Sequence, residues 1–159
     1  MAKITRKTSA QLQHGGAAPY GNLSRIAAQL KTNSSGGALE ADSSGAIASG
    51  DKVKLVLLPA GMTLDDYMMI VSVAFTASVV AKVGFEYADG VDSAVVPQDD
   101  DYFGAAIAIN ATGVYRKTAV TPPVTLPKDA WLILTTGGAA NAKAAQADIV
   151  VFGELTGNP

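Results

Sequence analysis

From residue 52 onward, hydrophobic and polar residues alternate with a period of two, which is typical of β-strands that bury one face. In the longest alternating segment, one face consists of Tyr67, Met69, Val71, Val73 and Phe75. The opposite face of this segment is also apolar, at Met68 and Ile70, which predicts a central strand or an interface between subunits. Further strands are expected at residues 53–57, 81–87, 102–110, 114–120, 124–126, 131–136 and 147–152.

These segments amount to seven or eight strands separated by turn signals every 8–15 residues, with at most one short helix. Strands with one apolar face must stack as two sheets to bury it. The sequence therefore predicts an all-β fold, a two-sheet sandwich of jelly-roll-like type, over residues 51–159. The pattern does not separate a jelly roll from an immunoglobulin-like topology.

The first 50 residues have a different character and predict an extended basic arm followed by a Ser/Gly-rich linker. Residues 15–21 are rich in Gly, Ala and Pro and do not suit a helix or a central strand. Residues 22–32 fit either a short helix or a strand. Residues 33–51 are rich in Ser, Gly, Ala and Asp, as in a flexible loop.

Charge is sparse and unevenly distributed. Charged residues make up 16% of the chain, below the usual value of about 25%. Such a surface favours association with copies or partners. The first 31 residues contain no acid, whereas the remainder carries 7 basic and 14 acidic residues. The sequence therefore predicts contact with an acidic partner surface through the basic residues of this segment: Lys3, Arg6, Lys7, Arg25 and Lys31.

Several classes of partner and chemistry are disfavoured. The basic residues form no dense cluster and the whole-chain pI is near 5.2, so direct nucleic-acid binding is not expected. The longest apolar run, residues 68–81, is too short and too interrupted to span a bilayer, and residues 1–20 lack the apolar core of a secretory signal. We expect a protein made in a cytoplasm or held in a particle assembled there.

Candidate catalytic and metal-binding residues are few, and we predict no enzyme activity and no cofactor or metal. The chain has no Cys, and His14 is its one histidine. The run Asp99 to Asp101 is the strongest cation candidate, but successive side chains of an extended segment point to opposite sides. Asp65-Asp66 is more typical of a loop cap than of a catalytic pair, and Gly137-Gly138 lacks the Lys that follows in a phosphate loop.

A longer pattern runs through the body of the chain. Gly50-Asp51-Lys52-Val53-Lys54-Leu55 leads to Leu58-Pro59-Ala60-Gly61-Met62-Thr63-Leu64, then to Val83-Gly84-Phe85-Glu86-Tyr87 and Asp89-Gly90, and on to Asp101-Tyr102-Phe103 and Val124-Thr125-Leu126-Pro127-Lys128-Asp129-Ala130-Trp131-Leu132. Over residues 50–153 this order resembles the capsid decoration, or cement, proteins of tailed bacteriophages.

The resemblance implies a structural protein of the virion that binds the outside of an assembled capsid and clamps neighbouring copies of the major capsid protein. It also implies a homotrimer. The residues expected at the contact between copies are Met68, Ile70 and Tyr102.

Two other interpretations stay open. The chain could be a head-fibre or tail-associated adhesin, with Tyr102, Tyr115 and Trp131 as sugar contacts. It could also be a carbohydrate-binding module that accompanies an enzyme.

Overall fold

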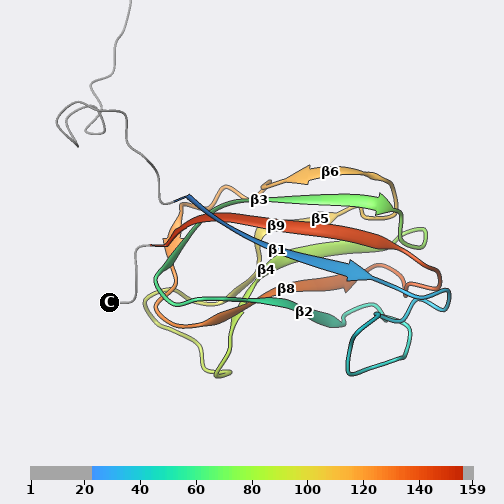
Figure 1. Ribbon diagram of the computed structural model, residues 1–159, viewed down its shortest axis with the longest axis horizontal. Coiled ribbons are helices and arrows are strands. Elements are labelled where there is room, and N and C mark those ends of the chain that lie inside the picture. The colour runs from blue at the N-terminus through green and yellow to red at the C-terminus, as the bar shows by residue number, and fades with distance from the viewer. Residues whose placement is uncertain (1–22, 156–159) are drawn as a thin grey trace, which may run out of the picture.

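The computed structural model describes residues 23–155, which form nine β-strands (Figure 1). The strands are β1 (Leu23–Lys31), β2 (Lys52–Leu58), β3 (Met62–Val73), β4 (Val80–Tyr87), β5 (Asp99–Ile107), β6 (Gly113–Arg116), β7 (Val124–Thr125), β8 (Ala130–Gly137) and β9 (Gln146–Leu155). The described residues contain no helix that is long and apolar enough to cross a membrane.

The strands build two antiparallel sheets that pack face to face. The five-stranded sheet has the order β1-β9-β3-β6, with β7 also paired to β3, and the four-stranded sheet has the order β2-β8-β4-β5. Because the last two strands insert between early ones in both sheets, the chain follows a jelly roll of interlocking antiparallel pairs. The predicted all-β, two-sheet sandwich is confirmed, and the pairing selects the jelly-roll order.

The core forms where the inward faces of the two sheets meet. Tyr67, Met69 and Val71 of β3 are buried, as the alternation predicts, and they face Leu132 and Leu134 of β8 within one hydrophobic cluster. Phe75, just beyond β3, is buried as well, whereas Val73 is exposed because the register with β9 shifts before it.

A cluster of five aromatic rings occupies this core, and one of its pairs is Phe85 with Tyr87, 5.9 Å apart and edge to face. The ring of Tyr67 lies 5.1 Å from that of Phe103, and Tyr102 lies 4.9 Å from Phe103 and 5.6 Å from Phe85, in edge-to-face arrangements for both Tyr102 pairs. Such pairs add to the stability gained from apolar burial alone.

A close approach of β5 to β4 depends on Gly84. A Cβ atom at this position would lie 2.0 Å from the carbonyl oxygen of Asp99. The register between the two strands also shifts on either side of Val83, so β5 bends across β4 at this point. Only a residue without a side chain allows this crossing.

The sandwich begins earlier than residue 51. The segment expected to be an arm includes β1, a nine-residue strand that pairs with β9 from Leu23 opposite Glu154 to Lys31 opposite Gln146. Strand rather than helix forms here because this pairing supplies hydrogen bonds and buries Leu30. Residues 1–22 lie outside the described part of the chain.

The Ser/Gly-rich segment after β1 packs against the sandwich. The amides of Ser35 and Gly37 donate to the Asn33 side chain, and Ile47 is buried in the core. This segment therefore closes the end of the sandwich between β1 and β2, which differs from the flexible linker that its composition predicts.

Other boundaries shift where long-range pairing overrides the local pattern. Asp99, Asp100 and Asp101 begin β5, three residues before the start of the strand expected at 102–110, and β5 ends at Ile107. The strand predicted over residues 114–120 ends at Arg116, where β6 stops pairing with β3.

Candidate interaction surfaces

The outer face of the five-stranded sheet carries an apolar cluster. Met68 of β3 pairs with Val150 of β9, and Ile70 of β3 pairs with Val114 of β6. Phe152 lies two residues along β9 from Val150 and therefore on the same face. Ile70 and Val114 are 36% and 62% exposed. We call these five residues the apolar cluster. Val150 at its base is buried and Met68 and Phe152 are half-buried, so the uncovered hydrophobic surface belongs mainly to Ile70 and Val114.

Charged residues of both signs surround the apolar cluster. The strand register places three basic and three acidic residues on this outer face: Arg25, Lys31, Arg116, Asp66, Asp148 and Glu154. Arg116 pairs with Asp66 at 3.3 Å and lies over the Phe152 ring, 5.8 Å from its centroid. Within residues 23–155, Arg25 and Glu154 form no ion pair. The face is thus electrically balanced.

The lysines on the outer face of the four-stranded sheet are paired within the chain, and exposed Leu57 lies opposite Trp131 near one end of this face. The ammonium groups of Lys52 and Lys54 each lie 3.1 Å from the Glu86 carboxylate. Partial burial raises the pKa of Glu86, but hydrogen bonds and charge from the two lysines outweigh it, so the pKa is lowered overall. Lys82 pairs with Asp100 at 3.4 Å on the same sheet. This surface has its charges satisfied within the chain.

An open groove of about 790 Å³ runs between β1, β2 and the loop that joins them. Its lining includes Leu30, Leu39, Ile47, Val53, Leu55 and Trp131, together with acidic and polar residues of the loop. Trp131 is half-buried and belongs to β8. It is the one aromatic residue in the lining.

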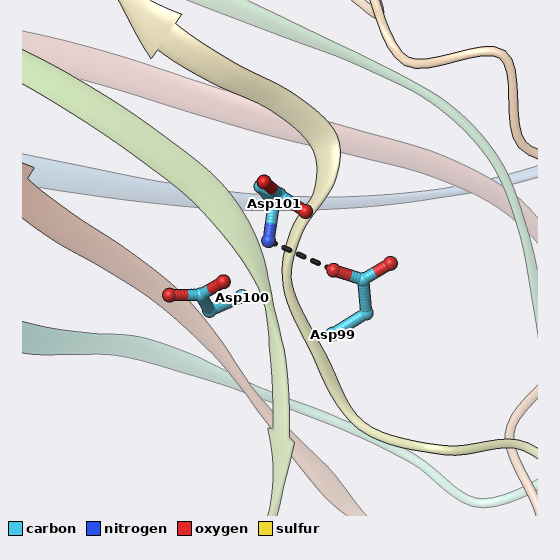
Figure 2. A group of neighbouring side chains, drawn as sticks. All are labelled: Asp99, Asp100 and Asp101. Atoms are coloured by element: carbon cyan, nitrogen blue, oxygen red, sulfur yellow. Dashed lines mark hydrogen bonds between the residues drawn. The ribbon is translucent and has the colours of Figure 1, made fainter.

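The three consecutive aspartates lie closer together than an extended segment predicts. Their carboxylate oxygens lie within 4.8 Å of one another, and the Asp101 amide donates to the Asp99 carboxylate at 3.0 Å (Figure 2). The contact with Asp99, then burial, raises the pKa of Asp101, and Lys82 partly offsets this. Lys82 supplies a cationic partner to Asp100 and Asp101. That the chain holds no metal or cofactor stays a prediction.

The predicted capsid-contact residues fall into two groups. Arg25 and Lys31 lie exposed on β1, six residues apart on one face. Lys3, Arg6 and Lys7 lie outside the described residues, as does His14.

The predicted oligomer contacts separate as well. Met68 is half-buried and Ile70 is exposed, and both belong to the apolar cluster. Tyr102, in contrast, is only 3% exposed, and its hydroxyl donates to the carbonyls of Leu64 and Pro122 at 3.0 and 2.9 Å. Tyr102 therefore packs in the core of its own chain. Its neighbour Phe103 is buried too, because the register shifts between β4 and β5 break the simple alternation along β5.

The apolar cluster contains three residues that the sequence pattern did not single out, Val114, Val150 and Phe152. Their signal was present in the alternation of short strands, where Val114 alternates with Tyr115 and Phe152 with Val151. Of the proposed sugar contacts, Tyr115 is half-buried, with its hydroxyl bonded to the carbonyl of Ala108 at 2.6 Å.

No protein-family model matches this sequence, and no curated protein matches it either. Solved structures do match the fold. A chain of the capsid of Ralstonia phage GP4 has a TM-score of 0.57 and 15% identity, over 85% of this chain and 86% of that one. A chain of the cyanophage Pam1 capsid asymmetric unit has a TM-score of 0.58 and 10% identity, over 97% and 94%. This chain therefore shares its fold with chains found in phage capsid structures.

Proposed function

We propose that this chain is a non-enzymatic structural protein of a tailed-phage virion that binds the outside of the assembled capsid and stabilises contacts between capsid subunits. The observation that carries the proposal is the jelly-roll match to chains of two phage capsids along nearly the whole length of each. Fold alone does not assign function. The proposal therefore also depends on the surfaces of this chain.

The distribution of polar groups supports adhesion rather than catalysis. Among residues 23–155, each carboxylate with a shifted pKa contacts a neighbouring charged group. Glu86 contacts two lysines, and Asp89 contacts Lys128. An active site instead requires titratable groups that converge on a space a substrate can enter. The prominent surfaces here are sheet faces.

The partner we propose is the major capsid protein, approached through basic residues near the start of the chain. Arg25 and Lys31 project from β1 into solvent, and Lys3, Arg6 and Lys7 precede them. Weak contacts of this kind become effective when many copies bind a repeating surface, since each bound site raises the local concentration at the next. We propose a homotrimer on the virion surface, assembled in the host cytoplasm, with no direct contact to nucleic acid or membrane.

Two measurements test this function. Mass spectrometry of purified virions is expected to find the chain at many copies per particle, and its absence from the virion would refute the proposal. In a binding assay with particles that lack the chain, Arg25→Glu with Lys31→Glu is expected to weaken attachment. Lys143→Glu, a matched exposed lysine outside β1, is expected to leave attachment unchanged.

The groove beside Trp131 favours one second candidate, an adhesin that binds host glycans. An accessible indole next to polar groups is a common platform for a sugar ring. A glycan array decides between the two: an adhesin gives binding that Trp131→Ala abolishes, whereas a capsid-binding protein gives none.

A further inference from the structure

The outer faces of the two sheets differ in how completely their side chains are satisfied. On the four-stranded sheet, Lys52, Lys54 and Lys82 are all paired to acids of the same chain. On the five-stranded sheet, Ile70 and Val114 remain exposed beside each other. Exposed apolar residues that are contiguous and rimmed by polar groups mark interaction surfaces.

The outer face of the five-stranded sheet is large enough for a specific contact. Strands of nine or ten residues are about 30 Å long, and four strands side by side span about 19 Å. Each copy then contributes about 600 Å², so that a contact between two copies removes about 1,200 Å² from water, the lower limit for specific protein interfaces.

The charges on this face indicate what covers it. Three basic and three acidic side chains surround the apolar cluster, so a strongly acidic or strongly basic partner would meet as much repulsion as attraction. A second copy of the same face presents both signs. Glu154, which has no ion-pair partner within residues 23–155, can then pair with a basic side chain of the second copy, whereas the proposed capsid contacts Arg25 and Lys31 lie on β1, at the edge of the sheet opposite to β6.

The position of β6 supports the same occupant. Among the described strands, β6 pairs on one side only, with β3, so Val114 lies at the edge of the sheet. An unprotected edge next to an apolar face is a surface that proteins normally cover. A neighbouring copy would cover the edge and the face together.

We propose that copies of this chain associate through the outer face of the five-stranded sheet, with Ile70 and Val114 as the exposed apolar residues of the contact. The inference deepens the proposed function by naming the surface through which copies meet. It rests on that proposal only in taking the chain to work as an assembly of copies. A face that meets the same face of another copy makes a two-fold contact, so this contact joins copies in pairs and is additional to the contacts of the proposed homotrimer.

The test uses the purified full chain without capsids. Native mass spectrometry and sedimentation are expected to show an oligomer at micromolar concentration for the natural chain. Ile70→Lys with Val114→Lys is expected to raise the dissociation constant by about a hundredfold, because two apolar side chains lose their burial and charges take their place. Val95→Lys is the matched control, since Val95 is 84% exposed in the loop after β4.

A second measurement covers the case in which the lysine variants fold poorly, which thermal melting would reveal. The chain contains no Cys, so Val114→Cys introduces a single thiol. Mild oxidation is expected to join Val114→Cys into covalent dimers and to leave Val95→Cys largely monomeric.

The outcomes separate the surface from the function. A monomeric natural chain, or an oligomer unaffected by the lysine variants, would overturn the proposed contact surface. Neither result would bear on capsid binding, which the capsid-binding assay above tests separately. A monomer whose capsid binding is lost in the lysine variants would assign this face to the capsid instead and would equally overturn the contact between copies.

Discussion

Replacing Asn141 with Ala is expected to destabilise the fold more than any other single change to a loop side chain described above. Asn141 is 1% exposed and lies in the loop between β8 and β9. Its side-chain oxygen accepts from the amide and the hydroxyl of Thr76, both at 3.1 Å. Its side-chain nitrogen donates to the Thr32 hydroxyl at 3.0 Å and to the carbonyls of Lys143 at 2.8 Å and Gly36 at 3.4 Å.

These contacts join three loops at one end of the sandwich. A buried hydrogen bond contributes about 1 kcal/mol net, and a partner left unpaired costs about 1–3 kcal/mol. The hydrogen bond to Gly36 is long, and Thr76 is partly exposed to water. We therefore assign these hydrogen bonds less than the usual contribution to the free energy of unfolding. We expect Asn141→Ala to lower the free energy of unfolding by about 3 kcal/mol, which corresponds to a fall in Tm of about 6–12 °C for a domain of this size.

Urea denaturation and calorimetry of the natural chain, Asn141→Ala and Asn110→Ala measure this effect. Asn110 is exposed in the turn after β5, and its replacement is expected to change stability by less than about 0.5 kcal/mol. Asn141→Asp keeps the acceptor but loses the donor at neutral pH, so its deficit should shrink as acid restores a proton. A loss below about 1 kcal/mol for Asn141→Ala would refute the view that this side chain holds the loops together.

Three further changes test other parts of the structure. Gly84→Ala places a methyl group against the β5 backbone and is expected to cost at least about 3 kcal/mol by thermal melting. Gly45→Ala costs little, because its added methyl group makes only an ordinary contact, 3.7 Å from the Ser43 hydroxyl oxygen. Folding raises the pKa of Asp101, so the ionised carboxylate opposes folding above that pKa. Asp101→Asn should therefore raise the free energy of unfolding by about a few tenths of a kcal/mol at pH 7. This gain should shrink as the pH falls through the pKa of the folded state. Tyr102→Phe should lower the free energy of unfolding by about 1 kcal/mol, since the carbonyls of Leu64 and Pro122 lose their hydroxyl donor.

Each of these expectations can fail visibly. Equal melting temperatures for the two glycine variants would show that β5 can move away from β4. Asp101→Asn is compared with the exposed Asp42→Asn, and an identical pH profile for both would remove the repulsion argument. If Tyr102→Phe had the stability of the natural chain but weaker self-association, Tyr102 would belong to the contact between copies and not to the core.

The strand pattern was predictable because it is local. Successive side chains of a strand point to opposite sides, so the burial of Tyr67, Met69 and Val71 follows from their spacing alone. The same rule indicated that Met68 and Ile70 point away from the core, since they alternate with buried residues. The sandwich then follows, because apolar faces of this kind require a second layer.

The pairing partners of each strand were not predictable in this way. The weak pattern over residues 22–32 becomes a strand because β9, more than a hundred residues later, offers it an edge. The acidic run at Asp99 becomes the start of β5 because β4 has room for it at Gly84.

By itself, the sequence determined that this protein is a two-layered β structure with a weakly charged surface, and which residues of each strand share a face. Only the tertiary structure decided which of the two faces is the interior for Tyr102, and which outward residues of β3, β6 and β9 gather into the apolar cluster. The physical reason is the sequence distance over which each feature is set. Alternation is set by neighbouring peptide units, so it can be read from the local pattern. Sheet order depends on hydrogen bonds between residues far apart in the chain, and the local pattern does not encode those bonds.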